Sequence, residues 1–387
     1  MTGATAPTGV WLVGARGSVG TTAALGLAAL AEGHAPPEGC VTAGPAFDGV
    51  PLPGWRDLVL GGHDVSDVSL TKHAEALVDA GMIPAPLLAA TAHALDAADA
   101  EVRPGYRGPL APGQSQRDVA ERLAADLTAF AARHGLARVV VVDVSSTEPP
   151  VDPLPEHTDP RALEAAASEP GRQVLPPSSV AAWAAVLAGA AYAGFTPSAG
   201  MGLPALRALA AERGVPVAGQ DGKTGQTWLR TALAPAFADR GLRVLSWAGT
   251  NLLGGGDGAT LADPDAVRSK LATKTRGLRD LTGTDVTPLH IDHVPDLGDV
   301  KVAWDHVHAR GFLGSRITLQ TTWSAHDSML AAPMVLDLAR LLALAHARGE
   351  AGVVPALGFF FKDPWGSDVH AAADQARALV TWAATAR

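Results

Sequence analysis

The pattern of apolar and polar residues begins with a short strand, a glycine turn and a helix. Residues 9–13 read GVWLV, an apolar run of strand length, and three glycines follow it between residues 14 and 20. The alanine- and leucine-rich stretch after them predicts a helix that ends at Gly33. The next apolar run, CVTA at 40–43, predicts a second strand, and the prolines and glycines of 44–68 predict turns.

Helical and strand patterns then alternate as far as about residue 219. Helical periodicity covers residues 70–80, 86–98, 115–134, 178–191 and 204–213. Strands are predicted at 137–144, a run apolar enough to be buried on both faces, and at 215–219, with a Pro- and Asp-rich loop at 149–160. This alternation predicts an α/β fold built on a parallel sheet.

From about residue 227 the pattern changes. The elements predicted there are a helix at 227–239, a strand at 243–249 and strand-like runs near 289–295, 299–308 and 315–322. Consecutive strands without helices between them predict a separate antiparallel sheet. Helices at 332–348 and 369–385 then resemble the helical cover of the first domain. The predicted domains are residues 1–227 together with 329–387, and residues 228–328.

Composition narrows the class of protein. The chain has 387 residues, 47% of them hydrophobic, which suits two domains with sizeable cores. Its formal net charge of -9 argues against nucleic-acid binding, but not against a small anionic ligand. A single cysteine, Cys40, excludes an intramolecular disulfide, and its apolar surroundings predict a buried, inert thiol. The N-terminus does not resemble a signal peptide and no uninterrupted membrane-length apolar stretch occurs, so we expect a cytoplasmic protein without a membrane segment.

The first glycine turn has the spacing G-x-x-G-x-x-G, with Gly14, Gly17 and Gly20. The usual dinucleotide fingerprint is G-x-G-x-x-G, so Arg16 stands where the second glycine is expected. Glycines let the backbone approach a pyrophosphate, and the helix N-terminus adds N–H donors. The acidic residue expected about 20 positions later, for the ribose hydroxyls, is replaced by Cys40. On this motif alone, a dinucleotide site and an ordinary tight turn are equally supported.

A second glycine-rich segment, DGKTGQT at 221–227, lies between a predicted strand and a predicted helix. A P-loop is excluded, because the position of its leading glycine is Val217. A helix start rich in glycine and hydroxyl groups, with one lysine, still suits a phosphate. The alternative is a helix capped by Thr224 or Thr227. Capping alone does not require the lysine, glycine and glutamine of the segment, so a phosphate site is favoured.

Four lysines are candidates for binding anions or moving protons. Lys270 and Lys274 are four residues apart, so on a helix they would share a face and repel each other unless an anion lay between them. Lys301 borders a predicted strand. Lys362 follows three phenylalanines, and apolar surroundings of this kind would depress the pKa of its amine. For any one lysine taken alone, a solvated surface charge is the better interpretation.

In their order along the chain, these segments resemble those of the myo-inositol-phosphate synthase family. VAGQDGKTGQT resembles the family's GDDxKSGQT, and NLLGGGDGATLADPDAVRSKLATK resembles NHLGNNDGxNLxxxxxxRSKxxxK. VPDLGDVKVAWD resembles VPxxGDSKxAxD, SAHDSMLAAPMVLDL resembles CEDSLLAxPIIxDL, and FFFKDP resembles YWLKAP. GGHDVS and VSSTEP resemble GGWDIS and ANTERY. The resemblance covers about residues 10–365 and keeps the lysines in register.

The resemblance implies a Rossmann domain that binds NAD, with an α+β catalytic and tetramerisation domain inserted before the C-terminal helices. The implied reaction is redox-neutral. A hydroxyl of glucose 6-phosphate is oxidised by NAD, the adjacent carbon enolises and attacks the aldehyde, and reduction of the ring ketone gives inositol 3-phosphate. The implied partners are a sugar phosphate and further copies of the chain in a homotetramer. Some family members use a monovalent or divalent cation, and the pair His306 and His308 does not define a metal site, so the metal stays unassigned.

The resemblance also implies site residues, position by position. Proton-transfer and oxyanion roles are implied for Lys270, Lys301 and Lys362. Further residues implied to line the catalytic pocket are Lys274, Asp221, Asp257 and Asp327. The substrate's phosphate and ring are implied to contact Thr224, Gly225, Gln226, Thr227 and Asn251. NAD is implied to contact Gly14, Ala15, Arg16, Gly17, Ser18, Val19, Gly20, Asp64, Val65, Ser145, Thr147 and Asp299.

The chain departs from the family where ring hydroxyls would be bound. The family's histidine and two asparagines of NHLGNND are Leu252, Gly255 and Gly256 in this sequence. Because the lysines are retained while these polar contacts are altered, the same chemistry on a different substrate is an alternative. One such substrate is fructose 6-phosphate, closed to a five-membered carbocycle as in carbocyclic nucleoside pathways. A plain NAD-dependent dehydrogenase and an NAD-binding regulator without catalysis are two further alternatives. The retained lysines argue against the regulator.

Overall fold

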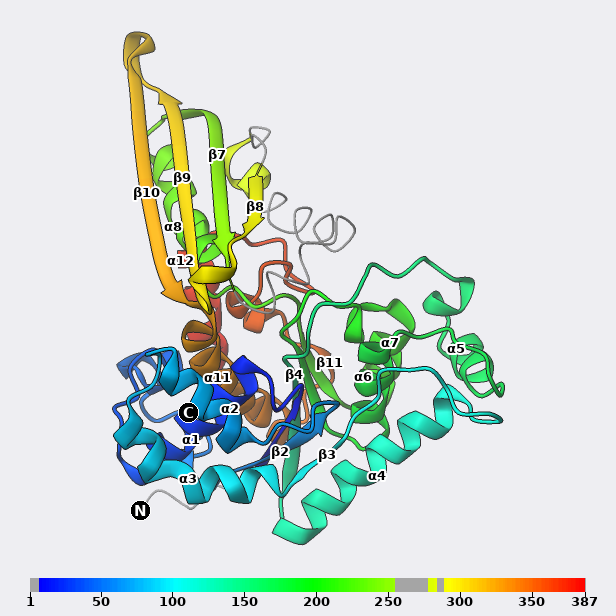
Figure 1. Ribbon diagram of the computed structural model, residues 1–387. Coiled ribbons are helices and arrows are strands. Elements are labelled where there is room, and N and C mark those ends of the chain that lie inside the picture. Colours follow the sequence, from blue (N-terminus) through cyan, green and yellow to red (C-terminus); the bar gives the residue numbers. More distant parts are fainter. Residues whose placement is uncertain (1–6, 255–277, 284–288, 387) are drawn as a thin grey trace.

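The computed structural model describes residues 7–254, 278–283 and 289–386. A large sheet forms the body of the molecule, and a smaller sheet projects from it (Figure 1). All pairs of neighbouring strands in the large sheet run parallel. In spatial order its strands are β11 (Gly352–Val353), β6 (Pro216–Gly219), β5 (Ala191–Gly194), β4 (Arg138–Asp143), β1 (Thr8–Val13), β2 (Leu58–Asp64) and β3 (Val102–Pro104). This is the doubly wound order of a dinucleotide-binding sheet, so the predicted α/β Rossmann fold is confirmed.

Helices cover both faces of the large sheet, and each face has its own apolar core. Val140 and Val142 of β4 face one core while Val139 and Val141 face the other, which explains why this strand reads as an uninterrupted apolar run. The helices on the first face are α1 (Ser18–Glu32), α2 (Leu70–Asp79), α3 (Ala85–Asp99) and α11 (Asp327–Ala347), and the C-terminal helix α12 (Ala372–Ala384) adds Leu379 and Ala383 to the same core. Those on the second face are α4 (Gln116–His134), α5 (Pro160–Ala167), α6 (Pro177–Leu187) and α7 (Pro204–Glu212).

Helix α11 links the two sheets. It follows the last strand of the small sheet directly and packs against α1, β4 and β5 of the large one. It begins at Asp327 and not near residue 332 as predicted, and Pro333 inside it explains why its first turns lack a clear helical pattern. Its length and apolar composition alone would suit a membrane span, but 78% of its most apolar stretch is buried in the protein, as in a core helix.

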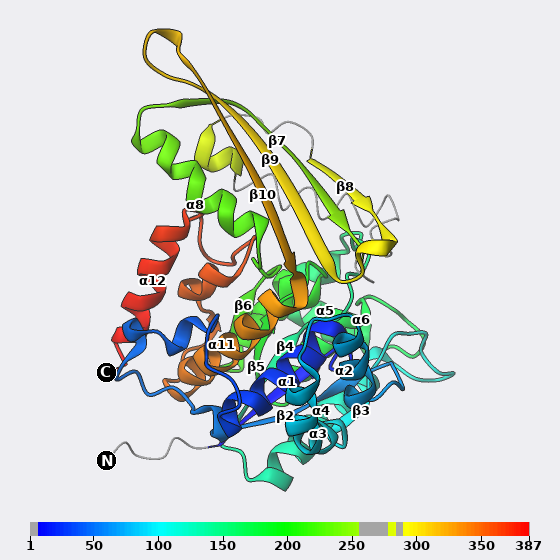
Figure 2. The same ribbon diagram turned by 60° about the vertical axis from the view of Figure 1, so that its left-hand side comes forward.

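The small sheet has four strands and is covered on one face by α8 (Gln226–Asp239), near α12 (Ala372–Ala384) (Figure 2). In spatial order the strands are β10 (Arg316–His326), β9 (Val300–Arg310), β7 (Arg243–Leu253) and β8 (Leu289–His293). Strands β7 and β8 run parallel, whereas the other two pairs are antiparallel. The predicted antiparallel sheet is therefore wrong, and the sheet is mixed. Residues 254–288 separate β7 from β8, a length that allows the crossover a parallel pair needs.

Four strands of the large sheet lie where the sequence did not predict them, namely β2, β3, β5 and β11. Residues 41–43 form a single 3-10 turn, because the backbone N–H groups of Val41 and Thr42 donate to the buried carboxylate of Asp337 at 2.6 and 3.1 Å. The strand that pairs with β1 on this side is instead β2, whose glycines suggested a turn. Gly62 is needed in this strand because a Cβ there would lie 2.4 Å from the Leu12 carbonyl oxygen. Likewise α6 ends at Leu187, and the small residues after it form β5.

Candidate active site

A pocket of about 120 Å³ lies at the carboxyl end of β4, beside the start of α1. Open α/β sheets bind ligands at this edge, where the strand order reverses between β1 and β4. The lining comes from both sheets and from the loops that join them. Eight residues predicted from the sequence line it, namely Val19, Ser145, Thr147, Asp221, Thr224, Lys301, Asp327 and Lys362.

The glycine turn between β1 and α1 is closed tightly against β4. A Cβ on Gly14, whose φ is +84°, would lie 2.8 Å from the Cα of Ser145, and one on Gly20 would lie 2.3 Å from the carbonyl oxygen of Ala15. Gly17 precedes α1, and no side chain of the described residues caps this helix. Its first N–H groups are therefore available to a pyrophosphate, as a dinucleotide site requires.

An acidic residue does stand at the end of the second strand. Asp64 is the last residue of β2, and its carboxylate accepts hydrogen bonds of 2.7 Å from the backbone N–H groups of Arg16 and Ser66. The inference that Cys40 replaces this residue is wrong, because it followed from a spacing of about 20 positions after the glycine turn, whereas β2 ends at Asp64. Cys40 is buried, as predicted, and burial raises the pKa of its thiol to about 12.

Lys362 and Asp221 form a buried ion pair in the pocket. The Lys362 Nζ donates to Asp221 Oδ1 at 2.7 Å, and the two side chains are 8% and 4% exposed. The Lys362 backbone N–H also donates to the Asp221 carbonyl oxygen at 2.7 Å. The sequence showed only the aromatic run before this lysine. The structure adds the carboxylate, so the amine is not surrounded by apolar groups alone.

Asp327 connects a second lysine with the glycine-rich loop before α8. The Lys301 Nζ lies 3.4 Å from both Asp327 carboxylate oxygens, and the Thr224 hydroxyl donates to Asp327 Oδ1 at 2.8 Å. Asp299, predicted to contact the cofactor, accepts a hydrogen bond of 3.0 Å from the Ser328 hydroxyl, and its contact with a cofactor stays a prediction. The pocket therefore presents two ammonium groups, each beside a carboxylate, from segments far apart in the sequence.

Gln226 and Asn251 lie near the pocket, but their side chains turn into the small sheet. Both are buried, and the Asn251 amide donates to Gln226 Oε1 at 2.9 Å while the Gln226 amide donates to Asp305 Oδ2 at 2.8 Å. Asp305 also accepts from Arg230 Nε at 2.8 Å and from Trp247 Nε1 at 2.9 Å. This buried network was not predicted, because it joins residues of a helix and two strands whose contacts the sequence does not reveal.

The first turn of α8 offers backbone groups to an anion. Gly225 precedes the helix, Gln226 and Thr227 begin it, and no side chain of the described chain caps it. The predicted phosphate residues at 224–227 are thus together, with the backbone N–H groups and the Thr227 hydroxyl as the donors, whereas the Thr224 hydroxyl already donates to Asp327. Lys223 is buried away from the pocket, where its Nζ donates to Gln375 of α12, and burial lowers its pKa to about 7.

Three predicted catalytic residues, Asp257, Lys270 and Lys274, lie outside the described residues. Within the described part of the chain, no group of three or more His, Cys, Asp or Glu side chains is placed to hold a metal ion. His306 and His308 share a face of β9, as predicted for a strand.

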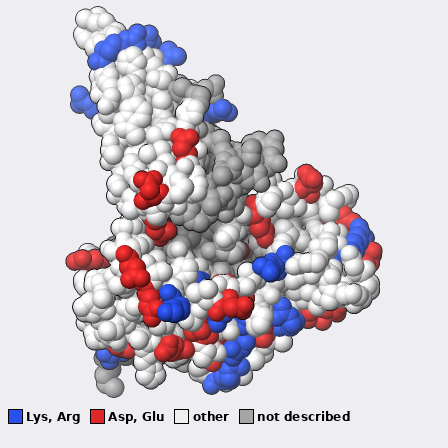
Figure 3. All heavy atoms as spheres, in the orientation of Figure 1, with Lys and Arg blue, Asp and Glu red and all other residues white. Residues whose placement is uncertain are grey.

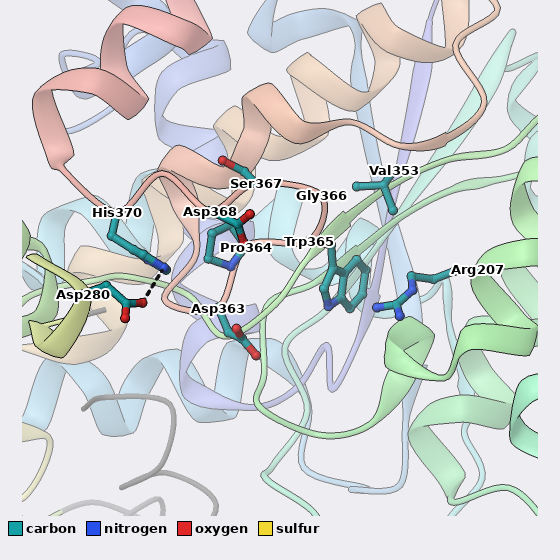
Figure 4. A pocket seen from close by; sticks show the side chains of 10 residues that line it. All are labelled: Arg207, Asp280, Val353, Asp363, Pro364, Trp365, Gly366, Ser367, Asp368 and His370. Atoms are coloured by element: carbon teal, nitrogen blue, oxygen red, sulfur yellow. Dashed lines mark ion pairs between the residues drawn. The ribbon is translucent and has the colours of Figure 1, made fainter. Parts of the chain in front are cut away.

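A larger pocket, of about 660 Å³, lies elsewhere and contains none of the predicted site residues (Figure 4). The Arg207 guanidinium lies over the ring of Trp365, 5.6 Å from its centre, and the His370 ring pairs with Asp280 at 3.5 Å. Because none of the predicted site residues line this larger pocket, its size alone does not make it the active site. The smaller pocket, where eight of those residues meet, is the better candidate.

Comparison with known proteins gives one consistent result. Residues 8–384 match the model of an NAD-binding family described as myo-inositol-1-phosphate synthase. The chain is 31% identical to inositol-3-phosphate synthase 1 of Bacteroides thetaiotaomicron, over 93% of this chain and 90% of that protein. The inositol-3-phosphate synthase of Drosophila melanogaster is 32% identical over 56% of this chain and 40% of its own length. The crystal structure of inositol-3-phosphate synthase from Caenorhabditis elegans matches with a TM-score of 0.87 at 24% identity, covering 98% of this chain and 86% of that one.

Proposed function

The chain belongs to the myo-inositol-1-phosphate synthase family, a family of isomerase-type enzymes, and from this premise we propose that it is an NAD-dependent, redox-neutral sugar-phosphate cyclase. The proposed reaction converts glucose 6-phosphate to inositol 3-phosphate. The observation that carries the proposal is the pocket itself, where the pairs Lys362–Asp221 and Lys301–Asp327 meet beside the glycine turn and the phosphate loop. A dinucleotide, two fixed cations and a phosphate site are what this reaction needs in one place.

The glycine turn fits a dinucleotide. A side chain at Gly14 would collide with Ser145 after β4, and one at Gly20 would collide with the carbonyl of Ala15 in the turn itself. The start of α1 is uncapped by the described residues, and Asp64 ends β2. NAD, when bound, would accept a hydride from the carbon that bears a sugar hydroxyl, whose proton would leave to a base, and the NADH would return a hydride to the carbon of the ring ketone, so turnover would consume no oxidant. Ser145 and Thr147 line the pocket at the end of β4, between this turn and the lysines.

The two lysines suit the steps between the oxidation and the reduction. Removing a proton from the carbon next to the ketone places negative charge on the ketone oxygen, and a fixed ammonium group stabilises that charge. In the aldol step the same carbon forms a bond to the aldehyde carbon, whose oxygen becomes negative and takes a proton. Lys301 and Lys362 can each stabilise or protonate one such oxygen, while Asp327 and Asp221 hold the ammonium groups in position.

The substrate's phosphate would bind at the first turn of α8. Backbone N–H groups of Gly225, Gln226 and Thr227 point from a helix N-terminus that no described side chain caps, and the helix dipole favours an anion there. The buried network around Asp305 holds Gln226, so its side chain would support this turn from below without itself binding the phosphate.

A second candidate substrate is fructose 6-phosphate, which the same chemistry would close to a five-membered ring. It is favoured by the departures from the family at Leu252, which is on β7, and at Gly255 and Gly256, which lie outside the described residues. Loss of these polar side chains changes how ring hydroxyls could be bound. A simple NAD-dependent dehydrogenase remains the alternative from another class.

The assembly proposed is a cytoplasmic homotetramer held together through the small sheet. Apolar side chains are exposed on this part of the molecule, with Trp304 38%, Phe312 85% and Leu313 90% accessible. A single exposed apolar residue needs no explanation. Phe312 and Leu313, however, are adjacent at the end of the projecting hairpin of β9 and β10, a position that suits a contact with another copy of the chain.

The test is separate incubation of the protein and NAD with glucose 6-phosphate and with fructose 6-phosphate, followed by NMR of the products. A six-membered cyclitol phosphate from glucose 6-phosphate is the expected result. A five-membered ring from fructose 6-phosphate would establish the second candidate. A steady rise in absorbance at 340 nm without any ring product would establish a dehydrogenase.

A further inference from the structure

A pocket of about 390 Å³ opens beside Asp64, at the end of the glycine turn away from the catalytic lysines. It is lined by Arg16 and Asp67, by Arg103 on β3 and by Arg107 after that strand. Rossmann proteins bind the adenosine ribose next to the acidic residue that ends the second strand. Given the proposed NAD, this pocket would therefore receive the adenosine part of the cofactor.

Arg16 occupies the rim of this pocket, and all of its guanidinium nitrogens are engaged. Its Nε and Nη2 donate to the two carboxylate oxygens of Asp99 at 2.8 and 3.1 Å, and its Nη1 donates to the Ser66 carbonyl oxygen at 2.7 Å. Asp99 is the last residue of α3 and also accepts a hydrogen bond of 3.1 Å from the Leu70 backbone N–H. The side chains of Arg16 and Asp99 are only 17% and 20% exposed.

An arginine in this place is normally a threat to specificity for NAD. NADP differs from NAD by a phosphate on the ribose 2′-oxygen, and arginine is the side chain that accommodates this phosphate in Rossmann proteins. Two parallel N–H bonds to a phosphate are strong and directional, and the same two donors of Arg16 are already taken by Asp99.

We propose that Asp99, together with Asp64, determines the cofactor preference of this protein: Asp99 holds Arg16, so that the guanidinium cannot pair with the 2′-phosphate of NADP. Asp64, fixed by the Arg16 and Ser66 backbone N–H groups, is left to accept hydrogen bonds from the free ribose hydroxyls of NAD. Asp99 is thus a positioning residue that acts through Arg16. The inference rests on the proposed NAD-dependent function.

Arg107 is a second arginine in this pocket that could pair with the 2′-phosphate of NADP in place of Arg16. It is exposed, it lines the same pocket, and among the described residues it has no ion pair. Arg103 is less available, because it pairs with Glu101 at 3.3 Å. Asp64 and Asp67 would both repel a phosphate, so any gain in NADP binding should require removal of the Asp64 charge as well.

The experiment measures dissociation constants for NAD and NADP by calorimetry on the full chain and its variants. The variants are Asp64→Ser, Asp99→Asn and the two combined. The Asp99→Asn change keeps an acceptor for the Leu70 N–H but removes the charge that holds Arg16. The combined variant should bind NADP at least about tenfold more tightly than Asp64→Ser alone, the size of one charge-assisted hydrogen bond. Adding Arg16→Gln should remove the gain, whereas adding Arg107→Gln should not.

An Asp99 with a purely structural role would weaken both cofactors together and leave the ratio of the two dissociation constants unchanged, which would overturn the inference. A gain that depends on Arg107 would overturn it as well. Thermal melting checks each variant, and Asp99→Ser repeats the test if the asparagine variant melts early. Wild-type protein that binds neither cofactor would contradict the proposed function, whereas wild-type NAD binding without the Arg16-dependent gain would contradict this inference alone.

Discussion

Lys301 and Lys362 reach one pocket from different parts of the chain, and each ammonium group lies against a carboxylate. A cation fixed in this way stabilises a developing oxyanion more than it stabilises bound substrate. Lys301→Ala should therefore lower kcat about a hundredfold or more, with NAD affinity and thermal melting unchanged. Lys72→Ala is the matched control, because Lys72 is on the surface of α2 with a side chain 72% exposed. Near-wild-type turnover in the Lys301 variant would contradict the assignment.

Lys223 is buried with an amide as its hydrogen-bond partner, and burial lowers its pKa from 10.5 to about 7. Between pH 7 and pH 10.5 the unfolded chain holds this proton more tightly than the folded one, so the free energy of unfolding should rise with pH. The slope that this lysine contributes is at most about 1.4 kcal/mol per pH unit.

Lys223→Met should remove that slope, so its stability advantage over wild type should shrink between pH 7 and pH 9. Urea unfolding of both proteins at pH 7, 8 and 9 measures the difference. A constant difference across the three values would show that the lysine has an ordinary pKa in the folded protein.

Site residues could be named from the sequence where a motif identifies them, whereas contacts that depend on packing alone could not, and the roles of the named residues stay predictions. Asp221, Thr224, Lys301, Asp327 and Lys362 were found from the order of motifs, and the structure brings them to one pocket. The buried ion pair of Arg230 with Asp305 was missed, because its partners belong to α8 and β9 and no local pattern connects them. Asp64 was named by resemblance, while the spacing rule pointed to Cys40.

At the scale of elements, the start of α8 determines where a phosphate can bind. Thr224→Glu would place a carboxylate beside the uncapped helix N-terminus, and like charges would repel the substrate. Binding of the sugar phosphate should fall by about a hundredfold or more, whereas NAD affinity should stay the same. Calorimetry with inorganic phosphate and with NAD measures the two effects separately.

Thr128→Glu serves as the control for that variant, because Thr128 is exposed on α4. Unchanged affinity of the Thr224 variant for both phosphate and glucose 6-phosphate would show that the phosphate binds elsewhere.

Elements were predictable where periodicity is strong and side chains are large. The helices α2, α3 and α4 and the strand β4 lie within a few residues of their predicted bounds. The strand β2 was missed, since Gly61 and Gly62 within it resemble a turn in a sequence. The strand β5 was missed, since its four residues AYAG directly follow an alanine-rich helical pattern. The parallel pairing of β7 with β8 was not predictable, because strand direction depends on the path of the intervening chain.

At the scale of the whole molecule, the small sheet projects from the Rossmann body and ends in an apolar tip. Phe312 and Leu313 lie between β9 and β10, and Figure 3 shows Lys and Arg side chains gathered at this end of the molecule. If the tip contacts another copy, Phe312→Ser combined with Leu313→Ser should lower the mass measured by light scattering below that of a tetramer.

Val369→Ser is the control for the tip, since Val369 is 43% exposed in another part of the chain. A wild-type mass of one chain would contradict the proposed tetramer, and an unchanged tetramer in the double variant would show that the tip is outside the interface.

The central claim is that oxidation and reduction occur within one catalytic cycle on a bound sugar phosphate. The most direct test supplies one equivalent of NAD per protein chain with a large excess of glucose 6-phosphate, then counts ring products by NMR while absorbance at 340 nm is followed. The account predicts many cyclitol phosphates for each NAD and no net accumulation of NADH. One oxidised sugar and one NADH for each NAD supplied, with no ring formed, would contradict it.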